Sequence, residues 1–192
     1  MIFIIFITGF IIGLIRGGKV SNIKKLKLTH PWTIFISVLI EASLLLLMRN
    51  DVEITQLFAF LSAILQYLLL FLFIWFNRQL PYIRVIGLGC FLNALVILLN
   101  FGSMPLADIS PYIRELESAS QYLLERNLVT YHIINENTKL WFLGDIIWLP
   151  SPFNAFISIG DLLLYGGVLL LIQHIITGNV QLRKEQKKKQ SA

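Results

Sequence analysis

Apolar positions along the chain fall into long runs that short polar segments separate. Uncharged stretches extend from Ile54 to Asn77, from Val85 to Ala107 and from Leu162 to Leu182, and about 20 such residues suffice for a helix to cross a bilayer. Two further apolar runs lie nearer the N-terminus. The pattern predicts an all-α fold, a polytopic helical membrane protein with about five transmembrane helices. The predicted spans are residues 1–16, 32–48, 56–76, 85–101 and 155–177.

One long segment, residues 102–153, does not fit a span. A Ser-Pro pair typical of a helix start is followed by apolar residues at every third or fourth position, which predicts an amphipathic helix over about 110–126 that lies along the outer membrane surface or caps the bundle. Pro150-Ser151-Pro152 prevents a continuous helix and predicts a reversal of the chain. We therefore expect one helical membrane bundle over residues 1–178 and a basic tail over residues 179–192.

The composition supports a membrane protein and excludes several kinds of site. Hydrophobic residues make up 56% of the chain and charged residues 14%, against roughly a quarter charged in soluble domains. The mean hydropathy of +0.73 excludes a soluble globule and a disordered chain. A single cysteine, Cys90, cannot form an internal disulfide, and the three histidines have no ligand-like spacing. No phosphate-loop or dinucleotide motif is present, so we expect neither a metal nor another cofactor.

The basic residues indicate an orientation in the membrane. Twelve of the sixteen lysines and arginines fall in the first loop, in the loop after the third span and in the tail, which all lie on one side. Because positive residues are retained in the cytoplasm, we expect a bacterial plasma-membrane protein with its N-terminus outside and its C-terminus cytoplasmic. The same loops and tail are expected to contact anionic lipid headgroups. The tail has no interleaved aromatic residues, which argues against a nucleic-acid partner.

Acidic residues lie where a bilayer makes them costly. Asp145 and Asp161 are flanked by apolar residues, and Glu41 and Asn93 are placed at a similar depth by their distance from the ends of their spans. A carboxylate at the bilayer centre costs about 2.5–3.5 kcal/mol on insertion scales. No lysine or arginine lies at that depth. The acids are therefore expected to be protonated, to share protons or to contact water, each of which raises a pKa.

Three short motifs carry a resemblance. They are Asn-x-Gly-x-Met-Pro at 100–105, Leu-Gly-Asp at 143–145 and Ser-Ile-Gly-Asp at 158–161. Together they resemble an uncharacterised family of small bacterial polytopic membrane proteins, a domain of unknown function, over most of the chain. The last two motifs are also locally similar to the aspartate motifs of lipoprotein signal peptidases and presenilin-like proteases. That similarity implies Asp145 and Asp161 as catalytic residues and a peptide or lipoprotein as substrate, although the Gly-Asn-x-x-Asp-Arg element of the signal peptidases is absent.

Three interpretations remain open. In the first, a membrane-embedded hydrolase acts at the outer leaflet: Asp145 and Asp161 share the roles of general base and general acid, Asn100 and Ser158 orient the substrate or the aspartates, and the outer helix controls access. A glycine before each aspartate would let a substrate backbone come close.

The second interpretation is a non-enzymatic bundle or accessory subunit, in which both aspartates are structural and accept hydrogen bonds from backbone amides or cap a helix. The third is a transporter that uses Glu41, Asn93 and Asp161 as a polar path.

Overall fold

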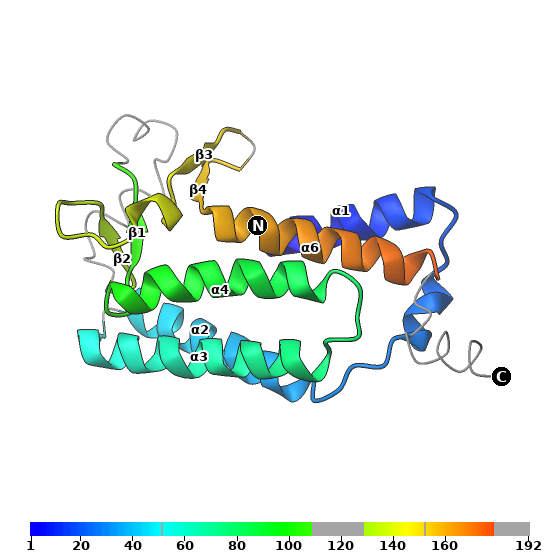
Figure 1. Ribbon diagram of the computed structural model, residues 1–192, viewed down its shortest axis with the longest axis horizontal. Helices are drawn as coiled ribbons and strands as arrows, with labels where there is room; N and C mark the ends of the chain where they lie inside the picture. The colour runs from blue at the N-terminus through cyan, green and yellow to red at the C-terminus, as the bar shows by residue number, and fades with distance from the viewer. Residues whose placement is uncertain (51, 109–128, 152, 179–192) are drawn as a thin grey trace.

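The computed structural model describes residues 1–50, 52–108, 129–151 and 153–178 (Figure 1). It is mostly helical. The α-helices are α1 (Ile2–Ile15), α2 (Trp32–Arg49), α3 (Gln56–Phe76), α4 (Ile83–Leu99) and α6 (Ile159–Ile176), and the short 3-10 helices are η1 (Val20–Lys25) and η3 (Trp141–Leu143). The amphipathic helix predicted over about 110–126 and the tail over 179–192 lie outside the described residues.

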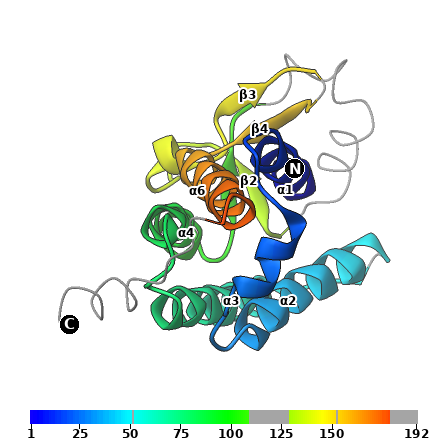
Figure 2. The same cartoon turned by 90° about the vertical axis from the view of Figure 1, so that its right-hand side faces the viewer.

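The helices form a curved row in which sequence order is not spatial order. The last helix, α6, packs between α1 and α4, α4 packs on α3, and α3 packs on α2 (Figures 1 and 2). The contact of α1 with α6 is close, because a Cβ atom added at Gly13 would lie 2.8 Å from Cβ of Ile176. Small residues at such crossings let two helix backbones approach, which is the usual way in which membrane helices associate.

Three of the described helices are long and apolar enough to cross a membrane. They are α2, α3 and α6, with 18, 21 and 18 residues. α1 and α4 are apolar but shorter, at 14 and 17 residues, so the prediction of about five spans is not confirmed. At 1.5 Å per residue, α1 rises about 21 Å, less than the ~30 Å of a bilayer core. Three apolar helices indicate a membrane protein.

Short strands gather at one end of the helices, so the predicted all-α class is wrong in this detail. β1 (Met104–Leu106) pairs in parallel with β2 (Tyr131–Ile133). β3 (Ile147–Leu149) pairs with β4 (Ala155–Ile157) in antiparallel orientation. The β3–β4 hairpin confirms the predicted reversal at the proline pair. Because residues 155–157 pair with β3, the last helix begins at Ile159 and not at the predicted residue 155. Periodicity alone missed these strands, since each has three residues.

The two ends of the helical row differ. β1 to β4 lie at one end, and η1, the α3–α4 connection and the C-terminal end of α6 lie at the other (Figure 1). At this second end Arg16 donates a hydrogen bond from Nη1 to Oε1 of Gln173 at 2.9 Å, and the Asn22 side chain donates to the carbonyl oxygen of Ile176 at 2.8 Å. These bonds fasten the first loop to the end of α6.

Candidate functional site

Asp161 lies at the start of α6, where it closes a capping box. Ser158 is the N-cap residue, and its hydroxyl accepts a hydrogen bond from the Asp161 amide at 2.9 Å. In return, Oδ2 of Asp161 accepts a hydrogen bond from the Ser158 amide at 3.4 Å. Each bond satisfies a backbone N–H that no helical carbonyl reaches. The Ser-Ile-Gly-Asp motif therefore has a local structural role, because it starts the last helix.

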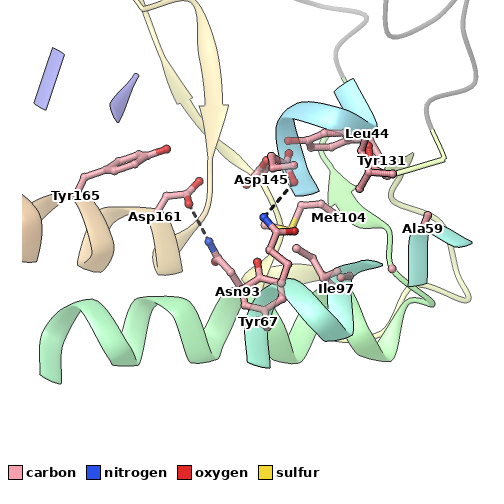
Figure 3. A pocket seen from close by; sticks show the side chains of 15 residues that line it. Leu44, Ala59, Tyr67, Asn93, Ile97, Met104, Tyr131, Asp145, Asp161 and Tyr165 are labelled. Atoms are coloured by element: carbon pink, nitrogen blue, oxygen red, sulfur yellow. Dashed lines mark hydrogen bonds between the residues drawn. The ribbon is translucent and has the colours of Figure 1, made fainter. Parts of the chain in front are cut away.

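The second carboxylate oxygen of Asp161 is held by α4. Asn93 donates from Nδ2 to Oδ1 of Asp161 at 2.8 Å, and its own Oδ1 accepts from the Ser158 hydroxyl at 2.8 Å (Figure 3). Asn93 is 8% exposed and Ser158 is fully buried. A buried amide with donor and acceptor both used has one orientation, so this network fixes the Asp161 carboxylate at the α4–α6 contact.

Asp145 lies between η3 and β3, outside the membrane-spanning helices. Its amide donates to the carbonyl oxygen of Pro105 at 2.8 Å, and its carbonyl oxygen accepts from the Ala107 amide at 3.0 Å. These bonds place the Leu-Gly-Asp motif beside the Asn-x-Gly-x-Met-Pro motif, which is about 40 residues earlier in the chain. The backbone of Asp145 is therefore held as rigidly as a residue in a strand.

The Asp145 side chain is buried without full hydrogen bonding. It is 7% exposed, and Oδ1 has no hydrogen-bond partner in the part of the chain that the structure describes. Burial raises the pKa of Asp145 to about 8, and the negative charge of Asp161 adds to the effect. At neutral pH the native carboxyl group is therefore mostly protonated.

Both aspartates line one cavity of about 240 Å³ (Figure 3). Glu41 and Asn93 line the cavity as well, together with Asp161. Glu41 accepts a hydrogen bond from Nε2 of Gln66 at 3.1 Å. The remaining polar or aromatic lining residues that the structure describes are Gln66, Tyr67, Thr130, Tyr131 and Tyr165.

The chain matches the model of a family of unknown function, DUF5317, over residues 25–173. The chain belongs to this family. No curated protein and no solved structure matches it. This match confirms the predicted resemblance to an uncharacterised family. It does not show the similarity to peptidases, and it assigns no activity to the chain. The chemistry of this family member has to be argued from the cavity.

Two other predicted site residues, Ser158 and Asn100, are not among the described residues that line the cavity. The Ser158 hydroxyl donates to Oδ1 of Asn93 and accepts from the Asp161 amide, so it joins the start of α6 to α4. Asn100 has another role: its side chain donates to the Lys139 carbonyl oxygen at 2.8 Å and accepts from the Lys139 amide at 3.0 Å. Asn100 thus fastens the loop before η3 to the end of α4, and it is not among the described residues that line the cavity.

The glycine before each aspartate lies against the chain itself, so the prediction of room for a substrate backbone at these positions is wrong. A Cβ atom at Gly160 would lie 2.8 Å from the carbonyl oxygen of Gly89, and a Cβ atom at Gly144 would lie 2.5 Å from the carbonyl oxygen of Pro105. Both distances are shorter than a van der Waals contact. The two glycines are needed because neighbouring backbone passes over them.

Two of the lining residues that were not predicted have weak signals in the sequence, and a third has none. Tyr165 follows Asp161 by four residues, and helix residues four apart share a face. Gln66 interrupts the apolar run of α3, and a polar residue inside a span is typically functional or paired. Tyr131 had no local signal, because the parallel pairing of β1 with β2 brings it to the cavity.

A separate polar cluster stabilises the strands. Ser103 Oγ lies 2.8 Å from Nδ1 of His132, and Nε2 of this histidine lies 3.2 Å from the hydroxyl of Thr138. Partial burial lowers the pKa of His132. Both ring nitrogens are engaged, so the histidine connects the residue before β1, β2 and the following turn. Among the described residues, no group of three histidine, cysteine or acidic side chains could hold a metal ion.

Proposed function

We propose that this family member is a membrane-embedded di-aspartate hydrolase that cleaves a peptide bond at the outer leaflet. One observation supports the proposal: two carboxyl groups, one from the loop between η3 and β3 and one from α6, line the same cavity in unlike surroundings. Asp161 accepts hydrogen bonds on both oxygens, whereas Oδ1 of Asp145 has no partner among the described residues. Paired acids whose surroundings differ are the usual way in which enzymes assign one acid and one base.

The proposed step needs one water between the carboxyl groups. Asp161 accepts a proton from the water, whose oxygen attacks the peptide carbonyl carbon, while Asp145 donates its proton to the carbonyl oxygen. A neutral gem-diol results. When the carbon–nitrogen bond breaks, the leaving nitrogen takes the proton from Asp161, and one gem-diol hydroxyl returns a proton to Asp145. The products are a carboxylic acid and an amine, and both aspartates regain their starting states.

Hydrolysis is tested in proteoliposomes with a quenched fluorescent peptide that carries an apolar segment. Asp145→Asn and Asp161→Asn are each expected to abolish turnover, and Glu136→Gln, an exposed turn residue outside the cavity, is expected to retain it. A second measurement is the binding of a statine-type peptide, whose hydroxyl group mimics the gem-diol. Full turnover in either aspartate variant contradicts the proposal. So does a wild-type protein that neither cleaves the peptide nor binds the statine.

A non-enzymatic role has its own supporting observation. The capping box and the Asn93 contact account for every hydrogen bond of Asp161 without any ligand. If both aspartates are only structural, Asp161→Asn lowers the melting temperature in detergent, since the amide nitrogen of asparagine cannot replace a lost acceptor. No variant then changes a catalytic rate. An unchanged melting temperature argues against the structural role.

We also propose that the basic end of the bundle faces the cytoplasm and contacts anionic lipid headgroups. Lys24 and Lys25 are exposed on η1, and η1 lies at the end of the row opposite to the strands (Figure 1). Positive side chains near the cytoplasmic surface gain about 1 kcal/mol each from anionic lipids. In this orientation the cavity and the strands face the outside.

A further inference from the structure

The cavity has an excess of hydrogen-bond acceptors and of acidic groups, one of which, Asp145, ionises more readily when a cation lies beside it. Glu41, Asp145 and Asp161 line it, and no lysine or arginine is among the described lining residues. Ionised carboxylates only accept hydrogen bonds. The amide groups of Asn93 and Gln66 donate to Asp161 and Glu41, respectively. Neither of these two bonds provides a hydrogen-bond donor for Asp145.

The Asp145 carboxyl group points to an occupant that donates hydrogen bonds. Its Oδ1 is unpartnered and the side chain is 7% exposed, so the cost of burying this oxygen is not offset within the described part of the chain. The χ2 torsion of aspartate is broad, so a rotation that exchanges the two carboxyl oxygens would bring Oδ1 to the cavity that Asp145 lines. A buried polar atom of this kind is rare in native structures, and a bound donor would satisfy it.

The aromatic side chains of the cavity lining indicate a second property of the ligand, because three tyrosines line the cavity together with the acidic residues. Tyr67, Tyr131 and Tyr165 come from α3, β2 and α6 and line the cavity together with the carboxyl groups (Figure 3). Aromatic faces attract cations through their quadrupole. Acidic and aromatic side chains around one space therefore favour an organic cation over a neutral donor.

A metal ion fits this cavity less well than an organic cation does. The described residues contain no group of three side chains that could ligate one metal, so the three carboxyl groups do not converge on a single point. The volume of about 240 Å³ greatly exceeds the ~30 Å³ share of one water. It is smaller than the roughly 300–1,000 Å³ of drug-sized pockets. A cation with N–H donors and a short carbon chain meets these limits.

We infer that the cavity binds a small primary ammonium ion, with the ammonium group at Asp145, near the charges of Asp161 and Glu41, and its carbon chain against the tyrosine rings. The inference goes beyond the proposed hydrolysis, because binding needs neither water attack nor turnover. An ammonium group supplies three hydrogen-bond donors and a positive charge, and the lining is rich in acceptors and has no lysine or arginine among its described residues. A quaternary ammonium ion has the charge without the donors, which makes it a discriminating probe.

The test uses the full-length protein in detergent at pH 7.5 and measures the change in melting temperature and the affinity by calorimetry. The probes are n-butylammonium, tetramethylammonium and the neutral 1-butanol. We expect n-butylammonium to raise the melting temperature with saturation, tetramethylammonium to bind at least tenfold more weakly, and 1-butanol to have no saturable effect. Equal responses to n-butylammonium and 1-butanol, or tighter binding of tetramethylammonium, overturn the inference.

Variants locate the site. Asp145→Asn and Glu41→Gln are each expected to weaken n-butylammonium binding by roughly tenfold, the effect of losing one charge-assisted hydrogen bond. The exposed Glu136→Gln is the matched control and is expected to bind as the wild type does. The melting temperature without a probe shows whether each variant is folded, and a folded pair of cavity variants with wild-type affinity overturns the inference. Amine binding without peptide cleavage contradicts the proposed hydrolase alone, so the two failures are distinguishable.

Discussion

Replacing Asp145 by asparagine changes the response of the native state to pH. Asparagine has nearly the shape of a protonated aspartic acid, and it does not ionise. The substitution therefore keeps the volume of the buried side chain, which is 7% exposed, and removes only the titration. No other change at this position separates charge from packing as cleanly.

The sign of the effect follows from linkage. The unfolded carboxyl group loses its proton near its ordinary pKa of 3.8, whereas burial holds the native pKa at about 8. Between these values the native state binds more protons than the unfolded state, so stability falls as the pH rises. Each pH unit inside this window lowers the free energy of unfolding by about 1.4 kcal/mol. Two units, from pH 5 to pH 7, correspond to about 2.7 kcal/mol.

The assay is thermal unfolding of the detergent-purified protein by circular dichroism at pH 5, 6, 7 and 8. At about 2–4 °C per kcal/mol for a chain of this size, Asp145 alone lowers the melting temperature by roughly 5–11 °C between pH 5 and pH 7. This contribution is expected to be missing from Asp145→Asn, so the variant is the more stable protein at pH 7. Glu136→Gln, on the exposed turn, should follow the wild-type profile. Parallel profiles for the wild type and Asp145→Asn would show that the native carboxyl group is not held protonated, and the reasoning would then be refuted.

Two further predictions concern packing and orientation. Gly160→Ala is expected to lower the melting temperature, because overpacking against the α4 backbone costs about 1–3 kcal/mol. Gly166→Ala on the same helix meets no atom within 4 Å and should be neutral or stabilising; equal effects of the two would contradict the close α4–α6 contact. In a Cys90→Ala background, a membrane-impermeant maleimide is expected to label Asn137→Cys in intact cells and to label Lys25→Cys only after the cells are opened. The reverse result refutes the proposed orientation.

Local sequence predicted the helices where run length alone decides them. The predicted spans 32–48 and 56–76 agree with α2 and α3 to within one residue. The last span was predicted to begin too early, because residues 155–157 are apolar enough for a helix and pair instead with β3. Apolar composition does not distinguish these two states over three residues. Pairing partners decide, and they lie elsewhere in the chain.

The same limit applies to the cavity. Glu41, Asn93 and Asp161 were placed in one layer by their depth along predicted helices, and depth is a local property. Tyr131 and the contact of Asp145 with Pro105 depend on backbone hydrogen bonds between segments far apart in sequence. No residue pattern states which strand pairs with which, so these features required the structure.

The two aspartates do not carry equal weight in the functional argument. Asp161 is explained by its own sequence, since Ser-x-x-Asp makes a capping box wherever it starts a helix, and Asn93 completes its bonding. Nothing comparable explains Asp145. Its backbone would make the same hydrogen bonds with any residue except proline at this position, yet the side chain there is a buried acid with an oxygen that has no partner among the described residues. A fold does not need such a group, and burying it costs stability. Asp145 is therefore the residue that most strongly indicates catalysis or ligand binding in this cavity. Variants of Asp145 test both functions most directly.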